Sequence, residues 1–228
     1  MREEFKYFLL NGKEISIVNQ RSNLSSISKA DLRRLYDSFS RWYDLAESIP
    51  ELLFFSSLRR DLLRQAKGKV LEVAAGTGRN LPYYPRECAI TAVDLSQAML
   101  QRAGTRAATL GMAVDFRVMD GENLKFKKGS FDTVVSTLTL CTFPDPKRAL
   151  KEMSRVLKPG GRILLVEHGR SSLGWLSRWQ DRHAPGHYAR LGCRWNQKPL
   201  DIIRSAGLKV GYSQARFFDV FHAVVAKP

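Results

Sequence analysis

The sequence predicts an α/β fold with a doubly wound, mostly parallel seven-stranded sheet. Three observations lead to this prediction. Short apolar runs alternate with helix-like segments along most of the chain, and alternating βα units build a parallel sheet covered by helices on both faces. A turn of small residues follows the first run of this series, at the strand end where α/β folds bind ligands. The last two runs follow each other with no helix between them, so they should pair antiparallel at the sheet edge.

The expected elements follow in chain order. Five strand-like runs lie at 69–74, 89–94, 113–118, 131–137 and 161–167, and the final pair lies at 207–215 and 217–227. Helix-like segments lie at 79–84, 96–110, 145–157 and 196–206. The residues from Lys158 to Gly161 include a Pro-Gly-Gly sequence, which predicts a sharp turn between the helix-like segment at 145–157 and the next strand.

The first 66 residues precede the alternating pattern. Residues 1–28 read as an extension in which Asn11-Gly12 predicts a hairpin. Two helix-like stretches, Ser28 to Asp44 and Glu51 to Gln65, predict a helical cap within 29–66. We expect residues 29–228 to form one domain, with an insert at 169–195 on its acceptor side.

The composition limits the classes of protein to which the chain can belong. The chain has 228 residues, 44% of them hydrophobic, which suits one globular domain with a full core. No apolar run reaches the roughly 18 residues of a membrane span, and the N-terminus lacks a signal-peptide pattern. Cys88, Cys141 and Cys193 are widely spaced with no CxxC pair. We therefore expect a reducing, cytoplasmic compartment, no disulfide framework and no metal.

The net charge of +15 is strongly basic. The excess is densest in residues 170–228, where 10 basic and 3 acidic residues give +7. The positive field of such a region favours binding to a polyanion such as an anionic lipid surface or RNA. A generally basic, solvated surface explains the same charge without a partner.

The turn after the first strand of the alternating series predicts a nucleoside site. Gly76 and Gly78 let the backbone approach a flat ligand. Asp94 ends the next strand, where a carboxylate accepts hydrogen bonds from ribose hydroxyls, and Asp120 follows the third strand, suited to an adenine amine. Leu81 stands where a dinucleotide fingerprint needs its third glycine, so one nucleoside is favoured over two.

Five segments carry a family resemblance: VLEVAAGTG, VDLSQAML, MDGENLKF, FDTVVSTLTLCTFPDP and EMSRVLKPGGRILLVEH. From about Tyr36 to its C-terminus the chain resembles the class I S-adenosylmethionine-dependent methyltransferases, which share a Rossmann-like fold. The subgroup it is most similar to contains quinone C-methyltransferases, phospholipid N-methyltransferases and membrane-associated thiol S-methyltransferases. Ala74 replaces the family's usual first glycine.

The resemblance implies S-adenosylmethionine as the cofactor and assigns roles at the strand ends. Gly76 and Gly78 would flank its amino-acid part, Asp94 would hold the ribose, Met99 would pack on adenine and Asp120 would meet the adenine amine. The full predicted cofactor set is Glu72, Ala74, Ala75, Gly76, Thr77, Gly78, Asp94, Leu95, Met99, Asp120, Gly121, Glu122 and Thr137.

Catalysis needs mainly the positioning of an acceptor, because the sulfonium methyl is already activated. Tyr36 and Tyr43 in the cap are candidate catalytic residues, since related enzymes fold an aromatic segment over the cofactor. His168, just past a strand, is the best-placed candidate base. Candidate substrate contacts are Leu138, His183, His187, Tyr188 and Arg190.

The insert contains two pairs of residues four apart, Trp175 with Trp179 and Arg178 with Arg182. On a helix each pair shares a face, as in helices at a lipid headgroup layer; the alternative is a helix whose tryptophans pack on the sheet. His183 and His187 have the same spacing, but Pro185-Gly186 should break the helix between them, so a metal pair is not expected.

These features predict a methyltransferase acting on a lipid-like or small-molecule acceptor. A phospholipid amine is favoured first, a quinol carbon second and a small thiol third. We expect a cytoplasmic protein, peripheral to the inner membrane surface. An RNA-directed methyltransferase using the same basic surface is the alternative from another class.

Overall fold

The computed structural model describes residues 9–10, 13–14, 27–46, 51 and 55–228. Two short strands, β1 (Leu9–Leu10) and β2 (Lys13–Glu14), pair antiparallel, which confirms the predicted hairpin. Its turn, Asn11-Gly12, lies outside the described residues.

A seven-stranded sheet forms the centre of the molecule, in the order β5-β4-β3-β6-β7-β9-β8. The strands are β3 (Lys69–Val73), β4 (Ala89–Asp94), β5 (Val114–Val118), β6 (Phe131–Thr137), β7 (Leu157–His168), β8 (Lys209–Arg216) and β9 (Phe221–Lys227). The first five are parallel, and β9 pairs antiparallel with both β7 and β8. The strand order reverses between β3 and β6, so a ligand crevice is expected at their carboxyl ends.

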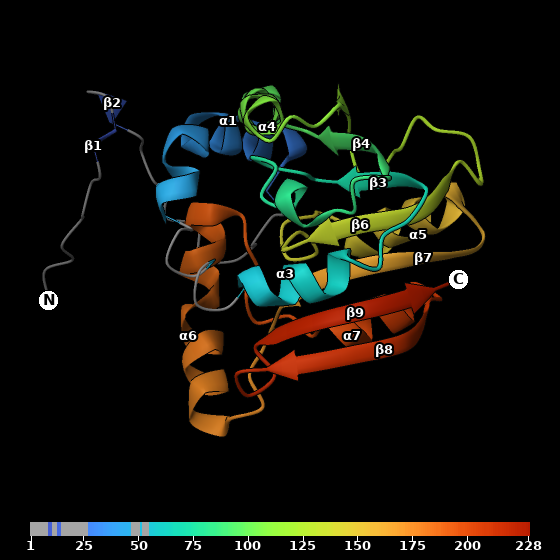
Figure 1. Ribbon diagram of the computed structural model, residues 1–228. Coiled ribbons are helices and arrows are strands. Elements are labelled where there is room, and N and C mark those ends of the chain that lie inside the picture. The colour runs from blue at the N-terminus through green and yellow to red at the C-terminus, as the bar shows by residue number, and fades with distance from the viewer. Residues whose placement is uncertain (1–8, 11–12, 15–26, 47–50, 52–54) are drawn as a thin grey trace, which may run out of the picture.

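Helices cover both faces and the carboxyl edge of the sheet (Figure 1). They are α1 (Lys29–Ala46), α3 (Ser56–Leu63), α4 (Gln97–Thr109), α5 (Pro146–Val156), α6 (Gly174–Leu191) and α7 (Pro199–Ser205). Alternate residues of the central strands face opposite cores: Leu71 packs with α5 and α7, and Val70 packs with α3. Figure 1 shows α1 and α6 at the end toward which β3, β4 and β6 point.

The prediction of a helix at 79–84 was wrong. Only a single 3-10 turn, η2 (Leu81–Tyr83), follows β3. Pro82 lies at its start and Pro85 follows Tyr84, whose backbone is extended with ψ 141°. A residue before proline is excluded from the helical region, so the segment cannot continue as a helix.

Two boundaries also differ from expectation. The segment Lys158–Gly161 is not a separate turn: β7 begins at Leu157 and pairs with β6 through a register shift, with Gly160 at φ +76°. Between the paired positions Phe131–Leu157 and Thr133–Arg162, β7 advances five residues and β6 two, so the extra residues of β7 bulge out of the ladder. Helix α7 begins at Pro199 rather than 196, because proline suits the first helical turn and holds Lys198 extended.

The predicted break at Pro185-Gly186 was wrong as well. Helix α6 runs continuously from Gly174 to Leu191 with Pro185 inside it. Proline removes one helical hydrogen bond, and side chains engage carbonyls in the same stretch. His183 Nδ1 donates to the Trp179 carbonyl at 2.8 Å and Trp195 Nε1 donates to the Gln180 carbonyl at 3.1 Å.

Candidate functional site: a nucleoside cleft beside an apolar cavity

A cleft opens at the carboxyl ends of β3, β4 and β6, beneath α1. The space it encloses, together with its open mouth, is about 790 Å³. Nine predicted cofactor residues line it together: Ala74, Gly76, Asp94, Leu95, Met99, Asp120, Gly121, Glu122 and Thr137.

Asp94 organises the floor of this cleft. Its Oδ2 accepts the Gly76 amide at 2.8 Å and its Oδ1 accepts the Ser96 amide at 2.8 Å. Burial raises the pKa of Asp94, and these amide hydrogen bonds oppose that rise. Each carboxylate oxygen has further acceptor capacity, as a contact to ribose hydroxyls requires.

The backbone at two cleft positions adopts the left-handed region. Ala74 has φ +56° and Leu138 has φ +59°, conformations that cost a non-glycine residue energy and cluster at functional sites. Gly76 is left-handed too, and a Cβ built on it meets no protein atom within 4 Å. That space beside the backbone suits a ligand, as predicted from the glycine turn.

The other four predicted cofactor residues lie behind the cleft wall: Glu72, Ala75, Thr77 and Gly78. Glu72 is buried and accepts hydrogen bonds from Asn80 Nδ2 at 2.8 Å and the Tyr84 hydroxyl at 2.9 Å. Burial raises the pKa of Glu72 to about 7. Its visible role is to hold the turn after β3.

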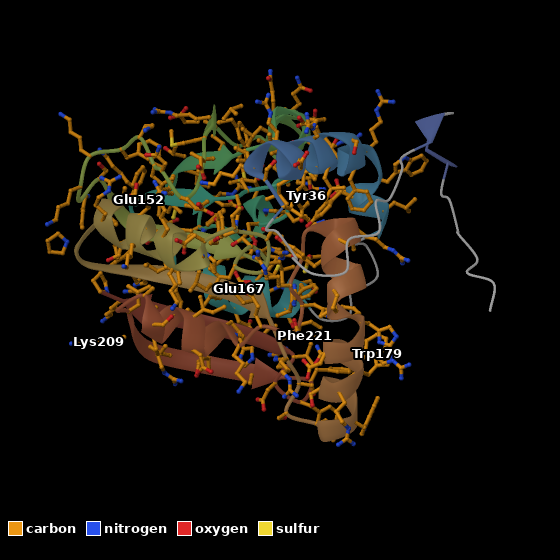
Figure 2. The ribbon with its side chains drawn as sticks, turned by 180° about the vertical axis from the view of Figure 1, so that it is seen from behind. Tyr36, Glu152, Glu167, Trp179, Lys209 and Phe221 are labelled. Carbon is orange, nitrogen blue, oxygen red and sulfur yellow. The ribbon has the colours of Figure 1, made fainter. Side chains whose placement is uncertain are left out.

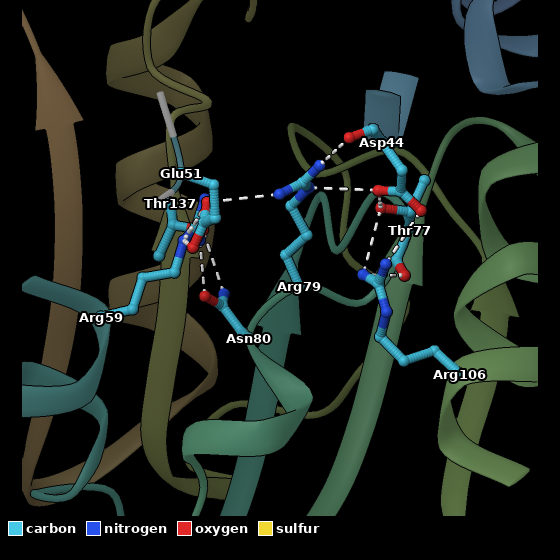
Figure 3. Close-up of polar contacts among 8 residues, drawn as sticks. All are labelled: Asp44, Glu51, Arg59, Thr77, Arg79, Asn80, Arg106 and Thr137. Atoms are coloured by element: carbon cyan, nitrogen blue, oxygen red, sulfur yellow. Dashed lines mark hydrogen bonds and ion pairs between the residues drawn. The ribbon is translucent and has the colours of Figure 1, made fainter. Parts of the chain in front are cut away.

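A polar network fixes the cap on that turn (Figure 3). Asp44, in the last turn of α1, pairs with Arg79 at 3.1 Å and Arg106 at 2.9 Å, and accepts from the Thr77 hydroxyl at 2.7 Å. Buried Arg59 of α3 donates to Asn80 and Thr137 and pairs with Glu51. Charged side chains therefore hold α1 and α3 against the cleft.

The contacts of Lys29, the first residue of α1, were not predicted from the sequence. Its Nζ lies 2.6 Å from Asp120 Oδ2 and 2.6 Å from Glu122 Oε2. The two acids predicted to meet the adenine end thus contact a cation of the cap. A surface lysine in a weak helix start carries no sequence signal for this role.

An apolar cavity adjoins the cleft on the side of α6. It measures about 1450 Å³ including its open side. Tyr36, Tyr43, Leu138 and Thr142 line both spaces, so the structure places the two candidate catalytic tyrosines at the junction. Burial raises the pKa of Tyr36 well above its usual value, which makes this hydroxyl a poor base. Figure 2 shows Tyr36 and Trp179 at the same end of the molecule.

His168 lies on the wall of this cavity rather than in the cofactor cleft. Its Nε2 is 3.3 Å from Cys193 Sγ. The pKa of Cys193 is lowered, first by the hydrogen bond from Cys141 and further by His168 and His187. The grouping of these cysteines with His168 was not foreseen from the sequence.

The structure separates the predicted substrate residues. Leu138 and His187 line the apolar cavity. Tyr188 is buried, and its hydroxyl accepts from Ile27 N and from Arg194, a structural position. His183 and Arg190 are exposed on α6 and line neither the cleft nor the apolar cavity.

Comparison with known proteins places this geometry in a family. Residues 71–165 match the model of a methyltransferase domain. Human thiol S-methyltransferase TMT1A is 32% identical over 170 residues, covering 71% of this chain and 69% of that relative. The chain belongs to the class I S-adenosylmethionine-dependent methyltransferases. It is therefore an enzyme whose methyl donor is S-adenosylmethionine.

This chain covers a smaller share of two other relatives. The mitochondrial methyltransferase OMS1 of Saccharomyces cerevisiae is 30% identical over 217 residues, 86% of this chain and 46% of that protein. Phosphatidylethanolamine N-methyltransferase of Cereibacter sphaeroides is 40% identical over 103 residues, 44% of this chain and 51% of that protein. The chain thus spans about half the length of these two relatives.

Solved structures agree on the fold. A S-adenosylmethionine-dependent methyltransferase from Thermotoga maritima superposes with a TM-score of 0.64 at 24% identity, covering 85% of this chain and 98% of that one. One from Aquifex aeolicus gives 0.56 at 18% identity, covering 88% and 98%. The Rossmann-like prediction is confirmed. Within the described part of the chain, every helix is too short or too polar to span a bilayer.

The residues present fit the methyl donor. The open space beside Gly76, the half-buried Asp94 and the apolar Met99 are suited to the amino-acid, ribose and adenine parts. When bound, the donor supplies an activated methyl group. The task left to the chain is to exclude water and hold the acceptor in line, at the junction lined by Tyr36 and Tyr43.

Proposed function

We propose that this enzyme methylates an apolar, lipid-like acceptor, with a phospholipid amine favoured first and a quinol carbon second. The observation that carries the proposal is the apolar cavity meeting the cofactor cleft at Tyr36, Tyr43, Leu138 and Thr142. A cavity of this size and apolar lining suits an acyl or isoprenoid chain better than a small polar metabolite.

The cavity mouth supports access from a membrane surface. Trp179 and Phe217 line the cavity. These two side chains are exposed, as are Trp175 on the same helix and Phe218 next to Phe217, and we call the four the aromatic rim. The Phe218 carbonyl accepts hydrogen bonds from the Ser171 hydroxyl and the Ser172 amide, at the start of the insert. The β8–β9 turn and α6 therefore lie side by side (Figure 1).

Positive charge accompanies the aromatic rim. Arg178, Arg182 and Arg190 are exposed on α6. Aromatic side chains at the headgroup level and cations beside them favour an anionic membrane surface. This surface supports a peripheral location on the membrane, and the name of one similar protein, a phosphatidylethanolamine N-methyltransferase, supports a phospholipid acceptor.

Label transfer tests the proposal directly. Purified protein is incubated with methyl-labelled S-adenosylmethionine and, separately, phosphatidylethanolamine vesicles, a reduced long-chain quinone, a small alkyl thiol and RNA. We expect label in the lipid-like acceptors. Label only in RNA would overturn the proposal, and label only in the water-soluble thiol would overturn its lipid-like preference.

A cavity-filling variant sharpens the assay. Leu176 lines the apolar cavity but not the cofactor cleft. Leu176→Trp should reduce lipid methylation at least tenfold while leaving S-adenosylhomocysteine affinity unchanged. Leu110→Trp, on the exposed end of α4, is the matched control. Equal methylation by both variants would contradict acceptor entry through the cavity.

A further inference from the structure

Three potential metal ligands converge on the wall of the apolar cavity. Cys141 lies in the loop after β6, His168 ends β7, and Cys193 follows α6. Their ligand atoms all lie within 4.8 Å of one another, and Cys193 Sγ is 3.3 Å from His168 Nε2. The three residues line the cavity together.

The donor set and spacing suit a soft divalent cation. Zinc binds cysteine sulfur at about 2.3 Å and histidine nitrogen at about 2.0 Å in tetrahedral sites. These bond lengths place neighbouring ligand atoms about 3.5–3.8 Å apart. The observed separations need only small side-chain adjustments to reach that geometry.

Hydrogen bonds hold the chain segments that carry the three ligands in place. The Cys141 carbonyl accepts the Arg194 amide at 3.0 Å, and Arg194 also donates to the Phe143 carbonyl at 2.9 Å. These contacts join the loop of Cys141 to the segment of Cys193. Buried Glu167 accepts the Leu140 amide at 3.2 Å and so holds the same loop against β7.

The histidine has the outer partner that metal-ligating histidines use. The Trp195 backbone lies close to the His168 ring, while Nε2 faces Cys193. A backbone partner of this kind fixes the ring orientation and leaves the other nitrogen for a metal. The His187 ring stacks on Trp195 at 4.1 Å between centroids, which packs the outer side of the cluster.

We infer that Cys141, His168 and Cys193 form a three-ligand site for Zn²⁺ or a similar soft divalent cation, with its fourth position on the side of the apolar cavity. Sites with three protein ligands keep an open position for a substrate or water. The fourth position would accept a soft donor such as a thiol. This open position follows from the count of three protein ligands, so neither it nor metal binding rests on the proposed lipid-like acceptor.

The sequence predicts no metal site, because it contains no CxxC pair and Pro185-Gly186 lies between His183 and His187. The ligands found here come from three segments far apart in the chain. Their convergence depends on the order of β6 and β7 in the sheet and on the return of the chain after α6, which spacing along the sequence does not reveal.

Cobalt substitution tests the site without requiring methyl transfer. Reduced, metal-free protein is titrated with Co²⁺, whose thiolate charge-transfer absorption reports cysteine ligation. We expect one Co²⁺ per chain, displaced by one equivalent of Zn²⁺. Reduced protein that shows no charge-transfer absorption, including one whose two cysteines only form a disulfide, would overturn the inference.

Variants identify the ligands. Cys193→Ser and Cys141→Ser should each abolish most of the charge-transfer absorption, and His168→Ala should weaken metal affinity roughly 100-fold. Cys88→Ser, half-buried near the Ala66 carbonyl, is the matched control and should bind as the parent does. Circular dichroism confirms that each variant is folded. Cobalt absorption that survives in folded Cys193→Ser would overturn the assignment.

The open position has its own readout. A stoichiometric small thiol should shift the absorption of the cobalt-loaded protein and add thiolate intensity. An unchanged spectrum with cobalt retained would overturn the open position. A failed label-transfer assay with intact cobalt binding would instead count against the proposed acceptor alone, so the two failures are distinguishable.

Discussion

Asp94 joins two strand ends of the cofactor cleft through the amides of Gly76 and Ser96. Asp94→Asn leaves one of these amides facing an NH₂ donor and removes the charge. Loss of a charge-assisted hydrogen bond costs about 1.5–3 kcal/mol. We therefore expect S-adenosylhomocysteine affinity to fall roughly 10–100-fold, measured by calorimetry.

The control for Asp94 is another aspartate outside the cleft. Asp115 lies on edge strand β5 in an exposed pair with Arg117, and Asp115→Asn should bind the ligand as the parent does. Equal affinities for the two variants would show that Asp94 has no part in ligand binding.

Glu72 gives a prediction for the pH dependence of stability. Burial raises the pKa of Glu72 from 4.5 to about 7, so the folded state favours the protonated carboxyl. Its stabilising contribution is fully present below pH 4.5 and is lost as pH rises through 7. A shift of this size corresponds to roughly 3 kcal/mol.

Glu72→Gln isolates this contribution, because the amide cannot ionise. The free energy of unfolding, measured by urea denaturation from pH 4.5 to 8, should fall with pH more steeply in the parent than in the variant. All other titrating groups are common to both proteins and cancel. Parallel curves across this range would contradict the assigned pKa.

Single residues also show what the sequence could and could not reveal. Gly76, Asp94 and Asp120 were predictable because each follows a strand end, and strand ends meet at one edge of a parallel sheet. The contacts of Lys29 and of Cys193 were not, because Lys29 reaches the cleft through the placement of α1 and Cys193 reaches Cys141 through the return of the chain after α6. Glu72 shares a strand end with the cleft residues, but its side chain points to the opposite side.

At the scale of elements, Asp44 is one of the polar residues that hold α1 against the body of the protein. Asp44→Ala removes the partner of two guanidinium groups, Arg79 and Arg106. Because these contacts are only partly exposed, we expect a loss of about 1–3 kcal/mol and faster amide hydrogen exchange in 29–46. Asp201→Ala, in an exposed pair with Arg204 at 3.7 Å, should change stability by less than about 1 kcal/mol. Equal exchange in both variants would contradict this anchoring.

The elements that were predicted correctly are those set by local patterns. Apolar runs defined the seven strands, and the final pair without an intervening helix defined the antiparallel edge. The errors involve proline. Pro82 and Pro85 reduced an expected helix to η2, whereas Pro185 was accommodated within α6. The carbonyl that Pro185 leaves without its helical N–H donor is that of Asp181, an exposed residue, so α6 continues with one hydrogen bond fewer.

At the scale of the whole molecule, the charge of +15 and the aromatic rim predict a directed attachment to membranes. Trp175 is 63% exposed on α6, and insertion of one such side chain contributes roughly 1.5–3 kcal/mol. Trp175→Ser should therefore weaken co-sedimentation with anionic vesicles at least tenfold. Raising the salt concentration should weaken binding of the parent, because screening removes the contribution of the arginines.

The matched control for Trp175 lies on edge strand β8. Tyr212 is 50% exposed there, and β8 lies at the far edge of the sheet, outside the cavity lining. Tyr212→Ser should bind vesicles as the parent does, since loss of an aromatic side chain matters only on the face that meets lipid. If the two variants sediment alike, or if salt leaves binding unchanged, the basic charge does not direct α6 to a membrane. Tight, salt-sensitive binding to RNA by both variants would then assign the charge to a nucleic acid instead.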